Sequence, residues 1–415
     1  MREFLETIKH HVITKEVSWK DTVTEEIIKH KEEPIIFENV EGHTTRIAAG
    51  IVSTRELLAK SIGVTPGELA DTVGAAFNNP LPLRKVETAP FLHTHIENPD
   101  IANYIPIPEF FGGKRYLTAS IVLALDPDTG RRNASIHRMM YLGKNRFAIR
   151  PVPQRHLHSF YTTALERGAD HLDIVVLLGV HPAFELGAAT SYPGLDEMAF
   201  ASYLMGGAEE YILNGIGVPK ETEIVMVGKM LREEVEEGPF VDLTGTQDHV
   251  RMQPLVEITD LYMRENPIFR TILPGMKEHK ILMGIPQEPR MKKLIKNTVP
   301  TVTNVVMTEG GGSWLHAVVQ IKKRTDGDGK NAIIAALAAH PSLKRVVVVD
   351  EDIDPTDPVD VEWAIATRFQ PDKDMVLVPG AKGSSLDPSA TNSITCKWGL
   401  DATKPLGATG FDRVI

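Results

Sequence analysis

Runs of apolar residues and the turns between them divide the chain into three regions. The first predicts short elements: a helix within residues 1–20, strands at 35–37 and 46–49, and two helices, one ending at Gly63 and one opened by Thr65-Pro66. Ser53 and Glu56 have the spacing of a capping box before the helix that ends at Gly63. We expect an N-terminal α/β module over residues 1–104, because the Pro-rich passage at 104–108 interrupts regular structure.

The second region, residues 105–295, is mostly strand. Apolar, β-rich runs at 117–125, 133–141 and 147–151 are separated by turn sequences. This tight spacing favours a meander or small barrel over a parallel sheet. A helix at 157–167, a buried strand at 172–180 and a helix start at 194–200 follow.

The third region, residues 296–415, alternates between strand and helix. The expected elements are strands at 315–321, 346–349 and 375–379 and helices at 332–339 and 359–368. Such alternation implies right-handed crossover connections. We therefore predict a C-terminal α/β domain with a parallel or mixed sheet.

Composition narrows the class of protein. With 415 residues, 42% of them hydrophobic, the chain can bury large cores in two or three domains. A net charge of −10 gives no basis for nucleic-acid or anionic-membrane partners, although it permits a local phosphate pocket. The start of the chain lacks a signal peptide and no apolar run is membrane-sized, so we expect a soluble, cytoplasmic protein. A single cysteine, Cys396, excludes an intramolecular disulfide and a cysteine-based zinc cluster.

Residues 131–158 concentrate polar chemistry in a segment that otherwise reads as strands. The segment carries one amide, two imidazoles and several guanidiniums, namely Asn133, His137, His156, Arg138, Arg146, Arg150 and Arg155. Such groups are costly to bury without partners, so their presence in a sheet predicts a bound anion, a metal ion or both. A solvated strand face rich in arginine is the alternative that composition leaves open.

Carboxylates elsewhere extend this candidate site. Glu197 falls in the first turn of a predicted helix, where the helix dipole alone would account for it. Together with Asn133 and His156 it would give an amide oxygen, an imidazole and a carboxylate, which suit Mn²⁺ or Mg²⁺. Glu237 and Asp242 lie five residues apart across a Gly-Pro turn, where both could face a cleft; a solvated acidic face is the alternative.

Several segments together resemble the successive signatures of the UbiD family of decarboxylases. These segments are 106–108, 133–138, Arg155-His156, 195–197, 237–242, 309–314 and 397–403. They follow the family's order and span roughly the last three quarters of the chain. The resemblance implies an α+β and α/β architecture with a flavin-reductase-like split β-barrel at its centre.

The resemblance also implies a cofactor: prenylated FMN supplied by a flavin prenyltransferase, with its phosphate bridged by Mn²⁺ (or Mg²⁺) and possibly K⁺. By position, Asn133, His156 and Glu197 match the metal ligands. The residues matched to the cofactor site are Asn133, Ser135, Ile136, His137, Arg138, Arg155, His156, Glu197 and Lys397. Apart from the resemblance, Lys397 would be read as an ordinary surface lysine.

Arg138, Glu237 and Asp242 match the family's catalytic set. Loss of CO₂ from an α,β-unsaturated acid would leave an unstabilised vinylic carbanion, so a cofactor must supply an electron sink. We expect Asp242 to protonate the product carbon and Arg138 with Glu237 to orient the substrate. Many members have Glu at the position of Asp242 and Gly at that of Val241, so the reach of the acid differs here.

Residues 137–140, 381–388 and 401–407 resemble an archaeal subgroup that converts trans-anhydromevalonate 5-phosphate to isopentenyl phosphate and CO₂ in a modified mevalonate pathway. The alternatives are a reversible decarboxylase of an aromatic or heteroaromatic acid, an oxidoreductase using plain FMN, and a non-catalytic carboxylase subunit. Family resemblance also implies a homodimer or homohexamer.

Overall fold

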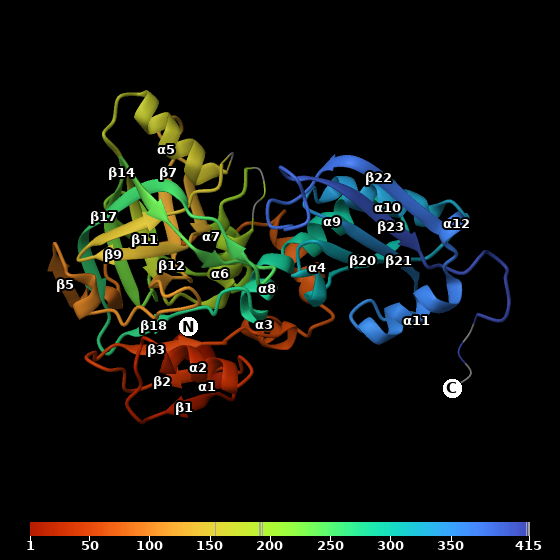
Figure 1. Ribbon diagram of the computed structural model, residues 1–415. Coiled ribbons are helices and arrows are strands. Elements are labelled where there is room, and N and C mark those ends of the chain that lie inside the picture. The colour runs from red at the N-terminus through yellow and green to blue at the C-terminus, as the bar shows by residue number, and fades with distance from the viewer. Residues whose placement is uncertain (154, 191, 193, 412, 414–415) are drawn as a thin grey trace. The chain divides into compact units, whose positions relative to one another are not determined.

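The computed structural model describes residues 1–153, 155–190, 192, 194–411 and 413. The chain forms two compact units, coloured along the sequence in Figure 1. The first unit comprises residues 1–242 and 247–282, and the second comprises 243–246 and 283–415. Each unit builds its own hydrophobic core. The three-domain division drawn from the sequence stays a prediction.

A small sheet with flanking helices begins the first unit. Its elements are α1 (Arg2–Thr7), β1 (His11–Ile13), α2 (Thr22–Lys29), β2 (Ile35–Phe37), β3 (Arg46–Ala49), α3 (Arg55–Ser61) and α4 (Leu69–Ala76). Strands β2 and β3 are antiparallel, as the short predicted turn requires, and distant β18 (Ile268–Arg270) adds in parallel to β3. The predicted cap of α3 was wrong by one residue, because the hydroxyl of Thr54, not Ser53, accepts the Leu57 N–H at 3.2 Å.

A curled nine-stranded antiparallel sheet dominates the first unit. Its strands are β5 (Thr94–Glu97), β6 (Tyr116–Leu117), β7 (Ile121–Leu125), β8 (Arg132–Ile136), β9 (Met139–Gly143), β10 (Arg146–Ile149), β11 (His171–Leu178), β14 (Ile224–Glu237) and β17 (Arg251–Met263). The order is β6-β9-β10-β17-β14-β11-β7-β8, with β5 on β17. The predicted hairpins β7–β8 and β9–β10 both form. The order places the ends of β9, β10, β17 and β14 side by side.

Short elements complete this unit. They are β4 (Arg84–Val86), η1 (Pro90–His93), η2 (Ile101–Asn103), β12 (Glu209–Leu213), β13 (Ile216–Pro219), β15 (Phe240–Val241) and β16 (Gln247–Asp248). Strands β4, β12 and β13 form a separate sheet, and β15 and β16 pair as an antiparallel ribbon with Phe240 opposite Asp248. That ribbon extends the chain beyond the end of β14.

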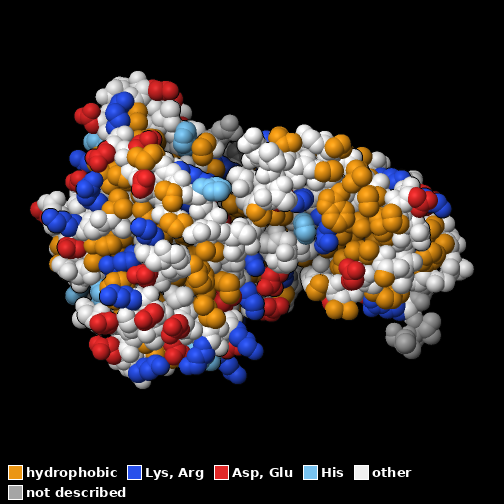
Figure 2. All heavy atoms as spheres, in the orientation of Figure 1, with side chains coloured by type: hydrophobic (Ala, Val, Ile, Leu, Met, Phe, Trp, Pro, Cys, Tyr) orange, Lys and Arg blue, Asp and Glu red, His pale blue; other side chains and the backbone are white. Residues whose placement is uncertain are grey.

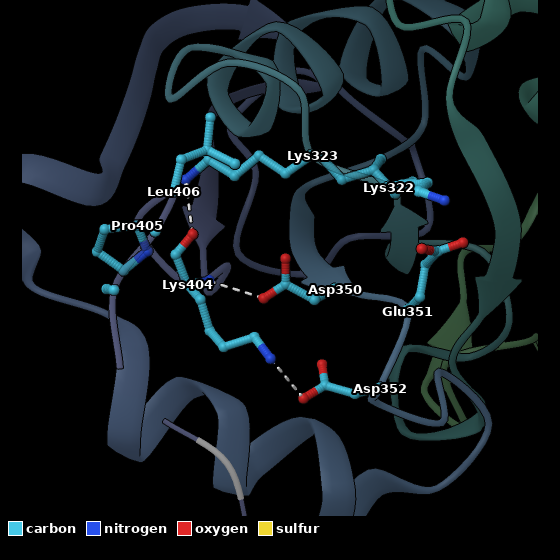
Figure 3. Close-up of a pocket in the computed structure, with 11 residues that line it drawn as sticks. Lys322, Lys323, Asp350, Glu351, Asp352, Lys404, Pro405 and Leu406 are labelled. Atoms are coloured by element: carbon cyan, nitrogen blue, oxygen red, sulfur yellow. Dashed lines mark hydrogen bonds and ion pairs between the residues drawn. The ribbon is translucent and has the colours of Figure 1, made fainter. Parts of the chain in front are cut away.

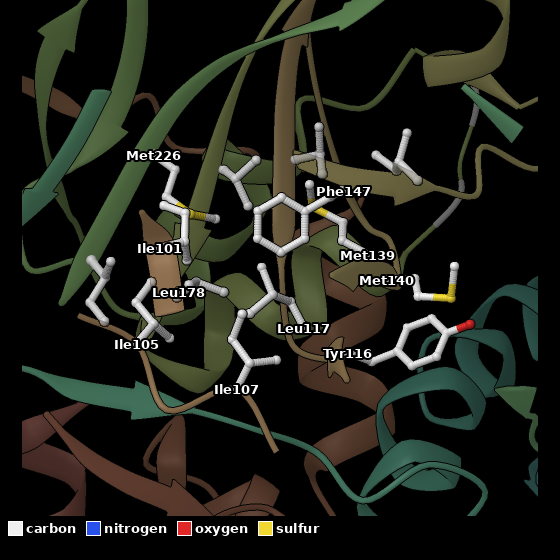
Figure 4. Packing of buried hydrophobic residues seen from close by; sticks show 14 of the residues in the cluster. Ile101, Ile105, Ile107, Tyr116, Leu117, Met139, Met140, Phe147, Leu178 and Met226 are labelled. Atoms are coloured by element: carbon white, nitrogen blue, oxygen red, sulfur yellow. The ribbon is translucent and has the colours of Figure 1, made fainter. Parts of the chain in front are cut away.

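The inner face of the large sheet packs a continuous apolar core, part of which Figure 4 shows. Leu117, Met139, Phe147, Leu178 and Met226 come from five different strands and are fully buried. Burial of each such side chain contributes roughly 1.5–3 kcal/mol. Tyr116 lies at the edge of this group with its hydroxyl pointing away from it.

Helices position two site residues beside the sheet. The helices are α5 (His156–Glu166), α6 (Pro182–Ala189) and α7 (Glu197–Leu204), and the two site residues are the first residues of α5 and α7. Helix α8 (Lys277–Gly284) leads out of the unit. Asp196 caps α7 by accepting two backbone N–H groups at 3.0 and 3.1 Å. Gly187 of α6 allows close packing on α7, because a Cβ there would lie 2.5 Å from the carbonyl oxygen of Glu197.

The second unit is an α/β domain with a mixed five-stranded sheet, as the sequence predicts. Its elements are α9 (Gln287–Lys296), β19 (Val302–Met307), η3 (Glu309–Gly311), β20 (His316–Ile321), α10 (Asp328–Ala339), β21 (Arg345–Asp350), α11 (Pro358–Arg368), α12 (Pro371–Asp374), β22 (Met375–Lys382) and β23 (Ile394–Asp401). Strands β20, β21 and β23 are parallel, and β19 and β22 close the edges antiparallel. Helices α9 and α10 pack on one face and α11 on the other.

Apolar side chains also reach the surface of this second unit. Figure 2 shows apolar side chains gathered where β22 and β23 lie in Figure 1. On these two strands, Leu377, Val378 and Ile394 are 60%, 37% and 47% exposed. In the described part of the chain, no helix has the length and apolarity needed to cross a bilayer. An exposed apolar patch of this kind is typical of an interaction surface.

Candidate active site

Strand β8 carries a hydrogen-bonded row of polar side chains. Asn133 and Ser135 alternate along β8 and therefore point to one side, and His137 follows the end of the strand. The amide of Asn133 donates to the hydroxyl of Ser135 at 3.0 Å, and that hydroxyl lies 2.7 Å from His137 Nε2. His137 Nδ1 donates to the Arg150 carbonyl at 3.0 Å, which leaves Nε2 as an acceptor. Burial lowers the pKa of His137 to about 4, so its imidazole is neutral.

The three predicted metal ligands lie near the start of this row. His156, the first residue of α5, places Nδ1 3.0 Å from Asn133 Oδ1. Glu197, the first residue of α7, accepts the backbone N–H of Ala134 at 3.1 Å. Asn133 and Glu197 are each 3% exposed. The alternative of a helix-surface role for Glu197 is therefore excluded by its burial.

This donor set fits a divalent cation. Burial raises the pKa of Glu197 to about 7, so a nearby cation would stabilise its ionised form. Burial, together with Arg131 and Arg155, lowers the pKa of His156 and favours the neutral imidazole that metal binding requires. In the described residues no three His, Cys, Asp or Glu side chains cluster as a metal site; the predicted set would use the amide oxygen of Asn133 as its third donor.

The predicted catalytic residues meet around Arg138, which lies between β8 and β9. Arg138 donates from Nε and Nη2 to the two oxygens of Glu237 at 2.9 and 2.8 Å, a bidentate pair, and from Nη1 to Asp242 at 3.3 Å. The guanidinium also lies 4.5 Å from the ring centroid of Phe240. Glu237 is fully buried, whereas the side chain of Asp242 is 18% exposed. Asp242 is therefore the carboxylate of this pair that faces accessible space.

Sequence reasoning missed two members of this cluster, Asp248 and Tyr116. Asp248 accepts from Arg138 Nη2 at 2.9 Å, although it lies 110 residues away. The Tyr116 hydroxyl donates to Glu237 at 2.8 Å, and burial beside that carboxylate raises the pKa of the phenol. A hairpin predicted across Gly245 would have placed Asp248 opposite Phe240 and revealed it.

Two further arginines surround Asp248. Arg251 donates to both Asp248 oxygens at 2.9 and 2.7 Å, and Arg150 donates to one of them. Burial and repulsion from Arg138 and Arg251 lower the pKa of Arg150 to about 10. The strand order explains the convergence, because Arg138, Arg150, Arg251 and Glu237 stand at one end of β9, β10, β17 and β14.

The remaining residues predicted to bind the cofactor are Ile136, Arg155 and Lys397. Ile136 ends β8, and Arg155 is the exposed N-cap residue of α5. Lys397 belongs to the second unit, on β23, where its ammonium donates to the Pro341 carbonyl at 2.5 Å. Its side chain is buried and burial lowers its pKa, so its reading as an ordinary surface lysine was wrong.

A cavity of about 380 Å³ opens in the second unit, beyond the carboxyl ends of β20 and β21. Figure 3 shows Lys404 there between Asp350 and Asp352. Lys404 donates to both carboxylates, from its backbone at 2.7 Å and its ammonium at 3.1 Å, and Lys323 donates to the Lys404 carbonyl. Lys404 and Asp352 form an ion pair in this cavity, and no predicted site residue lines it.

Models of three successive domains match the chain. They are the 3-octaprenyl-4-hydroxybenzoate carboxy-lyase N-terminal domain at residues 6–77, the Rift-related domain at 84–277 and the C-terminal domain at 280–402. The chain belongs to the UbiD family. UbiD proteins are carboxy-lyases, so the resemblance drawn from short segments and the enzyme class are confirmed.

Known UbiD relatives match along the whole chain. An anhydromevalonate phosphate decarboxylase of Methanothermobacter thermautotrophicus is 45% identical, with 100% of this chain and 99% of the relative covered. The UbiD-class enzyme HmfF of Pelotomaculum thermopropionicum, solved with FMN, superposes with a TM-score of 0.97 at 36% identity, covering 100% of this chain and 96% of that one. An evolved dimeric form of HmfF solved with prFMN has a TM-score of 0.92 at 34% identity over the same shares. The predicted UbiD fold is thereby confirmed.

Proposed function

We propose that this chain is a prenylated-FMN-dependent decarboxylase that converts anhydromevalonate phosphate to isopentenyl phosphate and CO₂. The substrate rests on the relative of that name, which is 45% identical over the full length. The chemistry rests on one observation above all, the guanidinium of Arg138 held by Glu237 with Asp242 at its other nitrogen. This set combines an anion-binding cation with a carboxyl group that can carry a proton.

The cofactor assignment is supported by the FMN and prFMN bound to HmfF and by the donor set of this chain. Asn133, His156 and Glu197 would hold Mn²⁺ or Mg²⁺ at the cofactor phosphate, with K⁺ nearby. The other residues assigned to the cofactor are Ser135, Ile136, His137, Arg138, Arg155 and Lys397. When bound, prenylated FMN supplies the electron sink that loss of CO₂ from an alkenyl carbon requires.

The side chains of this chain then bind the substrate and protonate its α-carbon. Arg138 binds the substrate carboxylate, and its bidentate pair with Glu237 fixes the guanidinium plane. Asp242, the more accessible carboxyl group, holds the proton that replaces CO₂ at the α-carbon. Tyr116 donates to Glu237 and so keeps this carboxylate oriented toward Arg138.

Assembly and location belong to the same proposal. We infer that the chain receives its flavin from a flavin prenyltransferase, acts in the cytoplasm and self-associates as a dimer or hexamer. Self-association is supported by the exposed apolar side chains of β22 and β23. Size-exclusion chromatography with light scattering would contradict it by finding a monomer at micromolar concentration.

The test is turnover of anhydromevalonate phosphate by protein produced together with a flavin prenyltransferase. We expect equal amounts of isopentenyl phosphate and CO₂, dependent on the modified flavin and abolished in Asp242→Asn. Loaded enzyme that leaves this substrate unchanged would refute the substrate and direct the search to aromatic acids. Turnover with plain FMN alone would refute the cofactor assignment.

A further inference from the structure

One carboxylate in the catalytic cluster accepts more hydrogen bonds than it has lone-pair directions. Asp248 accepts five hydrogen bonds, from Arg138, Arg150, the backbone of His249 and twice from Arg251. Its two oxygens offer about four lone-pair directions. Three guanidiniums converge on the same oxygen, Oδ2. A second anion at this place would relieve the crowding.

Charge is also unevenly distributed across the cluster. Arg138 contacts two further carboxylates, Glu237 and Asp242, whereas Asp248 is the partner that Arg150 and Arg251 share. The side of the cluster formed by Arg150 and Arg251 thus has two guanidiniums for one carboxylate. Both side chains retain access to solvent, at 16% and 28% exposure.

These two arginines stand next to the catalytic residues in the sheet. Arg251 is the cross-strand partner of Glu237, and the backbone N–H of Arg150 lies 3.4 Å from the Arg138 carbonyl. A small substrate bound at Arg138 by its carboxylate would therefore have a second cationic surface within the reach of its other end. A ligand with two anionic groups matches this arrangement, and planar guanidiniums suit phosphate geometry.

We propose that Arg150 and Arg251, bridged by Asp248, form the subsite that binds the phosphate group of the substrate. The inference rests on the proposed function and deepens it by naming the residues that select a phosphorylated acid over an unphosphorylated one. In the free enzyme Asp248 takes the place of the phosphate. On binding, the phosphate takes over donors from Arg150 and Arg251, and Asp248 keeps the remainder.

The first experiment measures steady-state kinetics of the prenyl-FMN-loaded enzyme with anhydromevalonate phosphate. Arg251→Gln should raise KM roughly tenfold to a hundredfold, the effect of losing hydrogen bonds to a charged group, and change kcat by less than about threefold. Arg251→Lys keeps the charge without the fork and should give an intermediate KM. Arg146→Gln is the matched control. Arg146 begins β10, the strand that ends just before Arg150, and it pairs with Glu233 at the surface.

A second measurement needs no turnover. Titration calorimetry with inorganic phosphate on the loaded enzyme, whose cofactor site is already filled, should show binding in the wild type and in Arg146→Gln. Binding should be lost in Arg251→Gln and in Arg150→Gln. Circular dichroism and flavin absorbance of each variant establish that it is folded and loaded.

The two measurements separate this inference from the proposed function. Wild-type turnover with an unaltered KM in Arg251→Gln and Arg150→Gln would overturn the subsite while the function stands. Phosphate binding that disappears in both variants, in an enzyme that does not turn over this substrate, would support the subsite and refute the function. Absence of phosphate binding in the wild type would overturn the subsite outright.

Discussion

The two polar regions on either side of His137 are built in opposite ways. The donor set of Asn133, His156 and Glu197 holds a buried carboxylate that, in the described part of the chain, has no ion-pair partner. The cluster around Arg138 instead balances three arginines with three carboxylates. A buried charge without a partner is costly, whereas paired charges offset much of each other's desolvation penalty. We therefore predict that the first region binds an external cation and that the second exchanges internal partners for a substrate.

The largest expected effect tests the proton donor of the paired cluster. Asp242→Asn removes the acidic proton but preserves the shape of the side chain, so decarboxylation should fall by about a thousandfold or more. Flavin and metal content should remain those of the wild type. Asp173→Asn on β11, at a position 78% exposed, is the control. Turnover of Asp242→Asn close to that of the wild type would exclude Asp242 as the acid.

The next effect tests the donor set. Glu197→Gln replaces the carboxylate ligand by a neutral amide, so metal affinity should fall at least tenfold to a hundredfold, the loss already seen on removing groups one step from a metal. Atomic emission and flavin absorbance measure metal and cofactor per chain. Glu234→Gln, at an exposed position on β14, should retain both. Full metal and flavin content in Glu197→Gln would contradict the assignment.

A third prediction concerns how His137, the residue between the two regions, makes the stability of the folded protein depend on pH. His137 has a folded-state pKa of about 4, below the value near 6.5 in the unfolded chain, because burial disfavours its cation. Its contribution to stability is therefore present above pH 6.5 and is lost as the pH falls toward 4, by on the order of 3 kcal/mol. Urea unfolding of the cofactor-free protein between pH 7 and 4 should show a steeper loss in the wild type than in His137→Asn. Equal slopes would contradict the neutral assignment.

The smallest effect refines the paired cluster. Tyr116→Phe removes one hydrogen bond to Glu237 and should lower the free energy of unfolding by about 1–2 kcal/mol and kcat by less than about tenfold. Tyr161→Phe removes a comparable bond, from the Tyr161 hydroxyl to the Leu231 carbonyl at 2.9 Å. The control should lose similar stability and keep its kcat. If both variants behave alike in kcat, Tyr116 has no positioning role.

Local pattern sufficed for much of the fold and for part of the site. The hairpins β7–β8 and β9–β10 follow from turn residues a few positions apart, and the α/β alternation of the second unit follows from its apolar periodicity. Asn133 and His156 could be predicted as site residues because polar groups in an apolar strand region need partners. Thr54 was missed as the cap of α3 because two adjacent hydroxyl residues satisfy the same pattern.

The contacts that the sequence pattern did not predict depend on pairing between distant segments. Asp248 and Arg251 join Arg138 because β10, β17 and β14 are neighbours in the sheet, and β18 joins β3 across more than 200 residues. The sequence by itself determined which side chains could do the chemistry and which local elements carry them, since both depend on residue types at short spacing. The tertiary structure alone decided that three arginines meet one carboxylate, because strand order and register are set by packing of the whole sheet.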